Sequence, residues 1–255
     1  MNKKNNSHSQ SNHSYWEGIK LQPFESLEST QTCDVCIVGA GISGLTIAYE
    51  LLKKGKSVII LDREKTLGGE TGLTSAHISD ALDDQYSHIE SLIGEEKTRL
   101  AAQSHKDAIE KIKSIIDAEG INCDFSYVDG YLICGGDNTV DCLEKEETAA
   151  RKAGLMDVEL VEKIPNLKRP LAKALKFPKQ AQFHALKYMA GLQKAVLSMG
   201  GKIYGQSLVN GFDSENDLIT VHVANKSSIN CMHLVYATNV PTHHMVNVHT
   251  KEAAY

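Results

Sequence analysis

The stretch "CDVCIVGAGISGLTIAYELLKKGKSVIILDRE" at residues 33–64 constrains the fold of this 255-residue chain more than any other. It opens with an apolar run that lacks polar alternation, which is typical of a parallel strand covered on both faces. Apolar residues then follow helical spacing over 42–52, and a second apolar run covers 58–61. Strand, helix and strand in this order predict a βαβ unit with a right-handed crossover.

Three glycines stand between the first strand and the helix, in the pattern Gly39-Ala-Gly41-Ile-Ser-Gly44. The first glycine permits a tight turn, the second lets the backbone approach a pyrophosphate, and the third allows close packing of helix on strand. The phosphates would sit at the positive end of the helix, where Ser43 adds a hydroxyl donor. The pattern predicts a dinucleotide site, and its alternative is a glycine-rich structural turn.

An acidic residue completes this pattern. Asp62 ends the second strand, 23 residues after Gly39. A carboxylate at this position accepts hydrogen bonds from the ribose hydroxyls of the adenosine. Arg63 follows it and is included among the residues expected to bind the cofactor. The glycine pattern alone does not separate a nicotinamide from a flavin dinucleotide.

The cysteines predict neither a metal site nor a disulfide. Cys33 and Cys36 fall in the first strand, where side chains three residues apart are expected to point to opposite faces. They are therefore expected to be separate core residues. Scattered cysteines in a chain without a secretory leader favour reduced thiols and a cytoplasmic location. The six cysteines stand at positions 33, 36, 123, 134, 142 and 231.

The charge and hydropathy of the chain argue against nucleic acid and membranes as partners. The net charge is -5 and there is no long basic run, so neither nucleic acid nor a membrane surface is expected as a partner. The longest apolar stretch, 35–52, contains three glycines and is too polar to span a bilayer. The first residues carry no apolar segment of the kind found in signal peptides and are expected to form a flexible tail.

The remaining sequence predicts an α/β fold with an inserted region. Apolar spacing beyond Asp80 predicts two amphipathic helices, with Gly94 at their junction and Gly120 after the second. Asp129-Gly130 predicts a short hairpin over 125–134. Two further helices are expected at 139–153 and 185–199, and apolar segments at 202–209, 218–224 and 232–237 are expected to return to the first sheet. The expected division is a tail and lead-in at 1–30, a binding domain at 31–85 and 179–255, and a substrate or cap region at 86–178.

Four stretches together resemble a known family: "DVCIVGAGISGLTIAYELLKKGKSVIILD", "LGGETGLTSAHISDALDD" at 67–84, "FPKQAQFHALKYMAGL" at 177–192 and "LVYATNVP" at 234–241. The chain resembles the D-amino acid oxidase-like FAD-dependent oxidoreductases, in particular the subfamily in which a C-terminal Rieske domain follows the flavin domain. The resemblance covers nearly the whole chain from Ser14 onward. It implies a Rossmann-like FAD/NAD(P)-binding domain that is interrupted by an α+β substrate region.

The resemblance also assigns residues to the cofactor. It implies that the loop at 68–77 runs along FAD toward the flavin ring, which favours FAD over a nicotinamide cofactor. For His77, which closes this loop, covalent attachment of flavin and a hydrogen-bonding role both stay open. The backbone of Val209 is implied to recognise the adenine edge, although the residue fits plain strand core equally well. The further contacts implied are Gly69, Thr71, Ser75 and Thr238.

The function implied is FAD-dependent oxidation, with hydride transfer from a small amine or amino-acid-like substrate to flavin. No catalytic residue can be assigned from the sequence. Members of the family continue past the position that matches Tyr255, so a truncated chain is expected, with a separate chain as a conceivable source of the remaining part. The alternatives are a non-catalytic remnant that binds a dinucleotide and, less favoured because of the second loop, an NAD-dependent dehydrogenase.

Overall fold

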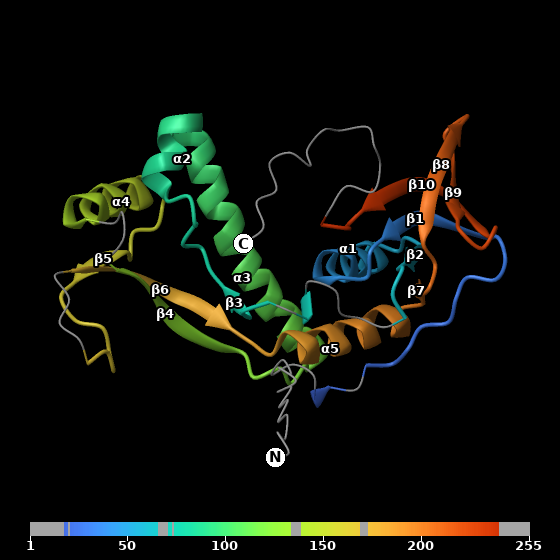
Figure 1. Cartoon of the computed structure of the whole chain (residues 1–255), viewed down its shortest axis with the longest axis horizontal. Coiled ribbons are helices and arrows are strands. Elements are labelled where there is room, and N and C mark those ends of the chain that lie inside the picture. Colours follow the sequence, from blue (N-terminus) through green and yellow to red (C-terminus); the bar gives the residue numbers. More distant parts are fainter. Residues whose placement is uncertain are drawn as a thin grey trace, which may run out of the picture. The chain divides into compact units, whose positions relative to one another are not determined.

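The structure is a computed structural model that describes residues 18–19, 21–65, 71–72, 74–133, 139–168 and 173–239. Its contacts divide the chain into two compact units (Figure 1). The first unit comprises residues 1–73 and 193–255, and the second comprises 74–192.

The limits of the units differ from the division expected from the sequence. The first boundary precedes β3 (His77–Ile78), because this strand pairs with β6 (Ala174–Gln182) of the second unit. The second boundary falls within α5 (Ala185–Ser198) rather than before residue 179. The first limit therefore reflects a strand pairing between residues that are far apart in the sequence.

The first unit is built on a six-stranded sheet in the order β7-β2-β1-β10-β9-β8. Strands β7, β2, β1 and β10 run parallel, while β9 pairs antiparallel with both β10 and β8. The predicted βαβ unit is confirmed, and so is the return of the later strands to the same sheet. The elements are β1 (Gln31–Val38), α1 (Ile42–Lys53), β2 (Val58–Leu61), β7 (Lys202–Tyr204), β8 (Val209–Glu215), β9 (Leu218–Val223) and β10 (Ser228–Tyr236).

Residues before the first strand belong to the core of this unit. The amide of Phe24 donates to the carbonyl of Lys65 at 2.8 Å, and Leu27 is only 1% exposed. Leu27 packs with side chains from β1, β2, β8, β9 and β10 in one cluster. The lead-in from Phe24 to Leu27 is therefore packed against the sheet of the first unit.

The two cysteines of β1 share one face of the sheet, so the prediction of opposite faces is wrong. Cys33 and Cys36 both belong to the cluster that also contains Cys231. The amides of Asp34 and Val35 both donate to the carbonyl of Ser57, at 3.2 and 3.1 Å. This irregularity breaks the strict alternation of side chains along β1.

These three thiols are free and buried. The hydrogen bond to Cys231, together with burial, raises the pKa of the Cys36 thiol far above its ordinary value. Cys36 is therefore protonated at neutral pH. Within the described ranges, no group of three or more histidine, cysteine, aspartate or glutamate side chains is arranged to hold a metal ion.

The second unit combines a sheet in the order β3-β6-β4 with a helical layer, and β5 also pairs with β6. The two predicted amphipathic helices are confirmed on either side of Gly94, and Gly120 ends the second with a φ of 59°. The remaining elements are α2 (Tyr86–Ile93), α3 (Glu95–Glu119), β4 (Ser126–Ile133), α4 (Val140–Lys152) and β5 (Glu159–Val161).

The hairpin predicted over 125–134 is wrong. The structure has one strand there, β4, which pairs with β6 along its length. The register shifts between Val128 and Gly130, so Asp129-Gly130 forms a bulge within the strand instead of a turn. Cys134, at the end of the predicted hairpin, lies outside the described residues.

Candidate dinucleotide site

The candidate site lies at the carboxyl end of β1, where α1 begins. β1 has β2 on one side and β10 on the other, and these three strands run parallel. The chain passes from β1 to β2 locally but reaches β10 only after the whole second unit. In open α/β sheets, ligands bind outside the carboxyl ends of the strands, at the point where the strand order reverses in this way.

Two glycines of the turn are required by the packing of the protein itself. Gly39 has a φ of 106°, and a Cβ atom there would lie 2.5 Å from the carbonyl oxygen of Ala237 at the end of β10. A Cβ atom at Gly44 would lie 1.9 Å from the carbonyl oxygen of Gly39. The turn and the close helix–strand contact expected from the sequence are both present.

Gly41 differs from these two glycines. Its φ of -71° and ψ of -175° are accessible to any residue. A Cβ atom there would meet only the Thr71 Oγ1 atom, at 3.6 Å, which is an ordinary contact. The described protein atoms therefore give no reason for a glycine at position 41. A ligand that approaches the bare backbone gives one.

The first turn of α1 is suited to an anion. Gly41 is the N-cap and supplies no side-chain hydrogen bond, and the first turn contains no acidic residue. The positive end of the helix dipole is therefore not neutralised by a carboxylate of the helix. Ser43 is exposed in this turn. The Ile42 amide donates to the Thr71 hydroxyl at 3.4 Å, which brings the second predicted loop to the glycine turn.

The Asp62 carboxylate is fixed against the glycine turn. Its Oδ2 atom accepts from the Ala40 amide at 2.6 Å, and its Oδ1 atom accepts from the Glu64 amide at 2.8 Å. The Ala40 contact was missed by the sequence analysis, because an alanine between two glycines carries no signal for it. A carboxylate offers about four acceptor positions, so about two stay available for ribose hydroxyls.

The other predicted residues of the first unit differ in their placement. A Cβ atom at Gly39 would lie 3.5 Å from the amide nitrogen of Thr238, so Thr238 borders the turn. The Arg63 side chain is 75% exposed and pairs with Glu64 at 3.4 Å instead. Val209 is 8% exposed, pairs with Val223 and packs in the core. A backbone contact of Val209 to adenine stays a prediction, and Gly69 lies outside the described residues.

Ser75 and His77 belong to the second unit. Ser75 is exposed next to Ala76, which has a φ of 62°. His77 is exposed in β3 opposite Gln182. The residues gathered around the start of α1 are therefore Gly39, Gly41, Ser43, Gly44, Asp62, Thr71 and Thr238.

The second unit contains a buried polar network that the sequence analysis missed. The Gln180 Nε2 atom donates to Asp80 Oδ1 at 2.7 Å, while Gln180 Oε1 accepts from the Ser79 hydroxyl and the Asp80 amide. Burial raises the pKa of Asp80 above its ordinary value. The Tyr86 hydroxyl donates to the Asp80 carbonyl, which ties the network to α2.

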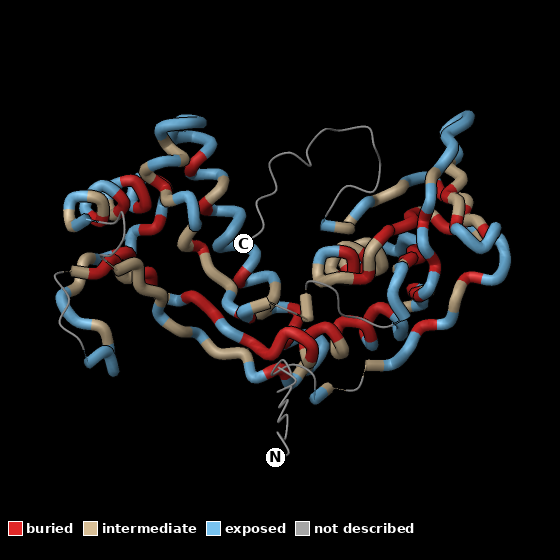
Figure 2. The backbone as a smooth tube through the Cα atoms, in the orientation of Figure 1, coloured by how far each residue is buried: buried red, intermediate tan, exposed pale blue. Residues whose placement is uncertain are grey.

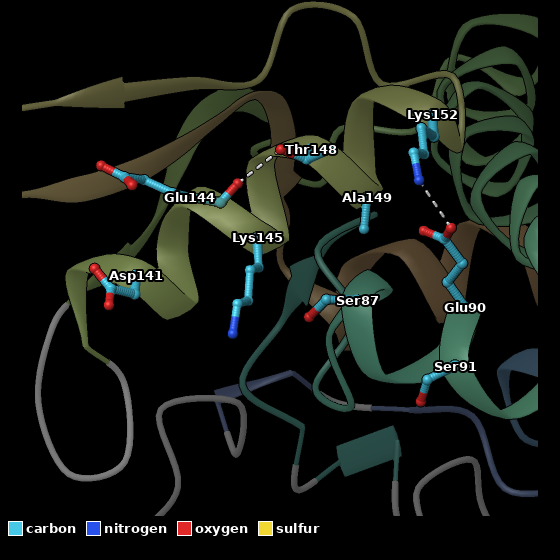
Figure 3. A pocket seen from close by; sticks show the side chains of 9 residues that line it. All are labelled: Ser87, Glu90, Ser91, Asp141, Glu144, Lys145, Thr148, Ala149 and Lys152. Carbon is cyan, nitrogen blue, oxygen red and sulfur yellow. Dashed lines mark hydrogen bonds and ion pairs between the residues drawn. The ribbon is translucent and has the colours of Figure 1, made fainter.

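A hollow of about 720 Å³ lies on the second unit between α2 and α4 (Figure 3). It is open and mixed in charge, and the Lys152 ammonium pairs with Glu90 across it at 3.1 Å. The figure also shows the Lys145 side chain pointing into the same space. No buried unpaired group among its lining residues indicates a ligand, so the glycine turn is the better candidate site.

Comparison with known proteins identifies relatives over most of the chain. The sequence profile of the family described as "FAD dependent oxidoreductase" matches residues 34–251. The putative Rieske 2Fe-2S iron-sulfur protein YhfW of Bacillus subtilis (strain 168) is 34% identical over 76% of this chain and 38% of its own length. Gamma-glutamylputrescine oxidoreductase of Escherichia coli (strain K12) is 26% identical over 74% of this chain and 45% of its own length.

The fold has close counterparts among solved structures. Glycine oxidase from Geobacillus kaustophilus superposes with a TM-score of 0.67 at 22% identity, over 81% of this chain and 55% of the oxidase. This similarity confirms the predicted α/β fold. The chain spans 38% and 45% of the length of the two curated relatives. Among the described helices, none has the length and apolar character needed to cross a membrane.

Proposed function

The chain belongs to the FAD-dependent oxidoreductase family of the D-amino acid oxidase type, and on that premise we propose that its first unit binds FAD at the glycine turn. The prediction of this family, with FAD as its cofactor, is confirmed at the level of the sequence profile. The observation that carries the proposal for this chain is Gly41. No described protein atom requires a glycine there, which leaves its bare backbone open to a ligand.

The turn offers a separate group for each part of the dinucleotide. The diphosphate would bind the amides at the start of α1 and the Ser43 hydroxyl. The Asp62 carboxylate, fixed by the Ala40 and Glu64 amides, would accept the ribose hydroxyls of the adenosine with its remaining acceptor positions. Thr71 would line the diphosphate from the second loop, and Thr238 would approach it from the end of β10.

The remaining assignments rest on the family resemblance. The backbone of Val209 would bind adenine, and Gly69, Ser75 and His77 would lie along the cofactor toward the flavin ring. Arg63 would contribute only by charge, because its side chain is directed to solvent and Glu64.

We propose oxidation of a small amine or amino-acid-like substrate as the activity. The name of the gamma-glutamylputrescine oxidoreductase supports a substrate of this class. FAD, when bound, supplies the hydride acceptor, while the protein orients the substrate and excludes water. Free cysteines support the cytoplasm as the compartment.

The test is a visible absorption spectrum of the purified 255-residue chain, before and after incubation with FAD and removal of the excess. We expect flavin bands at a ratio near one FAD per chain, and no comparable binding of NADH. Binding of NADH without FAD would favour the dehydrogenase alternative and reject this proposal.

Anaerobic mixing with a panel of primary and secondary amines and amino acids then tests the activity. Bleaching of the flavin bands by one class of amine is the expected result. Stoichiometric FAD that no amine reduces would favour the non-catalytic alternative.

A further inference from the structure

The second unit buries a carboxylate that has no counter-charge. Asp80 is 8% exposed, and no lysine, arginine or histidine that the structure describes forms an ion pair with it. Lys106 and His105 influence it electrostatically, but burial has the larger effect and raises its pKa. A buried carboxylate normally has a cation or several donors as partners, because its removal from water is costly. Asp80 therefore lacks part of the environment that a buried charge needs.

Gln180 holds one oxygen of this carboxylate and has no capacity left for the other. Its Nε2 atom donates to Asp80 Oδ1 at 2.7 Å and to the Pro178 carbonyl at 3.0 Å. Its Oε1 atom accepts from the Ser79 hydroxyl at 2.6 Å and from the Asp80 amide at 2.7 Å. These bonds use both donors and both lone pairs of the side-chain amide. Among the described residues, none donates to Asp80 Oδ2, so this oxygen can accept from a ligand.

The backbones of β4 and β6 are shaped to place this glutamine. Strand β6 is buried at most of its positions (Figure 2). Lys179, directly before Gln180, has a φ of 59°, and the register with β4 shifts at the same level, between Val128 and Gly130. A Cβ atom at Gly130 would lie 3.1 Å from the Gln180 Cγ atom, so the bulge leaves room for the glutamine side chain. A lysine in the left-handed region within a strand is strained, and such strain concentrates at functional sites.

Asp80 lines a cavity of about 70 Å³ whose lining residues all belong to the second unit. Its walls include the side chains of Ile109, Leu155 and Val158, which are at most 8% exposed. One water-sized group needs roughly 10–15 Å³ of such space, so the cavity has room for about five of them. Apolar walls beside one buried polar group suit a ligand with a polar head and a short apolar chain.

The charges around the cavity favour a cation. Two of its lining residues, Asp157 and Lys179, pair with each other at 3.7 Å. Two others, Lys106 and Glu110, are exposed on α3, where a spacing of four residues makes them neighbours of opposite charge. Asp80 is the buried charge that these pairs do not balance. Because buried charges are screened less than exposed ones, Asp80 sets the sign of the ligand.

We infer that this cavity binds the ammonium group of a short primary alkylamine. The ammonium donates to Asp80 Oδ2, and an alkyl chain of about four carbons lies against Ile109, Leu155 and Val158. An anion would be repelled by the carboxylate, and an uncharged alcohol would leave it without a counter-charge. The inference goes beyond the proposed function, because it rests on the second unit alone and needs neither FAD nor oxidation of the amine. Failure of either proposal leaves the other standing.

Calorimetric titration of the full chain without FAD is the first measurement, with n-butylammonium chloride as the probe and 1-butanol and sodium butyrate as probes of equal length. We expect saturation at one n-butylammonium per chain, and binding of the other two that is at least about tenfold weaker. Equal binding of n-butylammonium and 1-butanol would overturn the inference, because the apolar walls alone would then explain it. A titration without saturation would also overturn it, since the cavity would then hold only water.

Methyl NMR spectra from the same titration locate the ligand. The signals of Ile109 and Leu155 should shift with the affinity that calorimetry gives. The signals of Leu92, which is 68% exposed at the end of α2, should stay in place. Shifts at Leu92 without shifts at Ile109 would overturn the inference, because the amine would then bind elsewhere.

Substitutions test the buried charge. Asp80→Asn keeps an oxygen for Gln180 and removes the charge, so it should bind n-butylammonium at least about tenfold more weakly. Asp83→Asn makes the same change at an exposed residue of the same loop and should bind like the unsubstituted chain. Equal affinities of these two variants would overturn the inference. If Asp80→Asn fails to fold, Lys106→Met decides. Removal of this exposed cation should tighten binding about two- to threefold, and an affinity that does not rise would overturn the inference.

Discussion

The two units satisfy their polar groups in different ways. In the second unit, the buried carboxylates accept from groups of the protein: Asp80 from Gln180, and Glu146 from the amides of Tyr86 and Ser87 at 2.7 and 2.8 Å. In the first unit, the N-cap residue Gly41 supplies no side-chain acceptor to the start of α1, where the Ile42 amide donates to the Thr71 hydroxyl at 3.4 Å. A helix N-terminus of this kind beside a bare backbone is suited to an anion that is not part of the protein.

The comparison also separates two kinds of glycine within one turn. Gly44 is needed by packing, and Gly41 is not. A methyl group at Gly44 should therefore destabilise the fold, whereas a methyl group at Gly41 should weaken only the binding of the ligand.

The largest effect is expected for Gly44→Ala. Its Cβ atom would lie 1.9 Å from the Gly39 carbonyl oxygen, which is a backbone atom that cannot move alone. The substitution should lower the free energy of unfolding by at least about 3 kcal/mol, since overpacking of a core costs roughly 1–3 kcal/mol even where side chains can adjust. Urea denaturation measures this change. Gly211→Ala, at a position with no atom within 4 Å, is the matched control and should remain stable.

The next effect is expected in the second unit, for Glu146→Ala. This side chain is 1% exposed and accepts from two amides at the start of α2. Its removal leaves those amides without an acceptor and should cost about 2–3 kcal/mol. The adjacent Glu147→Ala breaks only a surface ion pair with Arg151 and should cost less than about 1 kcal/mol. Equal midpoints for the two variants in urea would show that the second unit does not depend on this buried carboxylate.

A smaller effect is expected for Asp80→Asn. Burial raises the pKa of Asp80 above the ordinary value of 3.8, so the folded state binds this proton more tightly than the unfolded state. The contribution of Asp80 to stability is therefore present below pH 3.8 and is lost as the pH rises through the folded-state pKa. The Asp80→Asn variant, whose amide oxygen can still accept from Gln180, should therefore be more stable relative to the unsubstituted chain at pH 7 than at pH 4. Thermal unfolding at the two pH values measures the difference, and a variant that is equally destabilised at both would contradict this sign.

The sequence was sufficient to predict the features of the fold that depend on a local pattern of residues. The βαβ unit, the turn at Gly39 and the helix stop at Gly120 each follow from spacing or from a single backbone angle. It was insufficient to predict the features that depend on pairing with a distant segment of the chain. Asp129-Gly130 is compatible with a turn or a bulge, and only pairing with β6 selects the bulge.

The same limit applies to the cysteines and the site. Cys33 and Cys36 share a face because two amides use one carbonyl of Ser57, and no residue type in β1 signals this. The contact between Asp62 and the Ala40 amide likewise depends on how β2 ends beside the turn. The motif predicts which residues meet the cofactor, while the structure shows what holds them in place.

The most direct test of the central proposal is the FAD affinity of Gly41→Ala, measured by calorimetry against the unsubstituted chain and Gly18→Ala. No atom lies within 4 Å of a Cβ at Gly18, so that variant controls for an added methyl group. Gly41→Ala should unfold at the same urea concentration as the unsubstituted chain yet bind FAD at least about tenfold more weakly, a loss of about 1.4 kcal/mol. Unchanged FAD affinity in this stable variant would contradict a diphosphate seated on the backbone at Gly41.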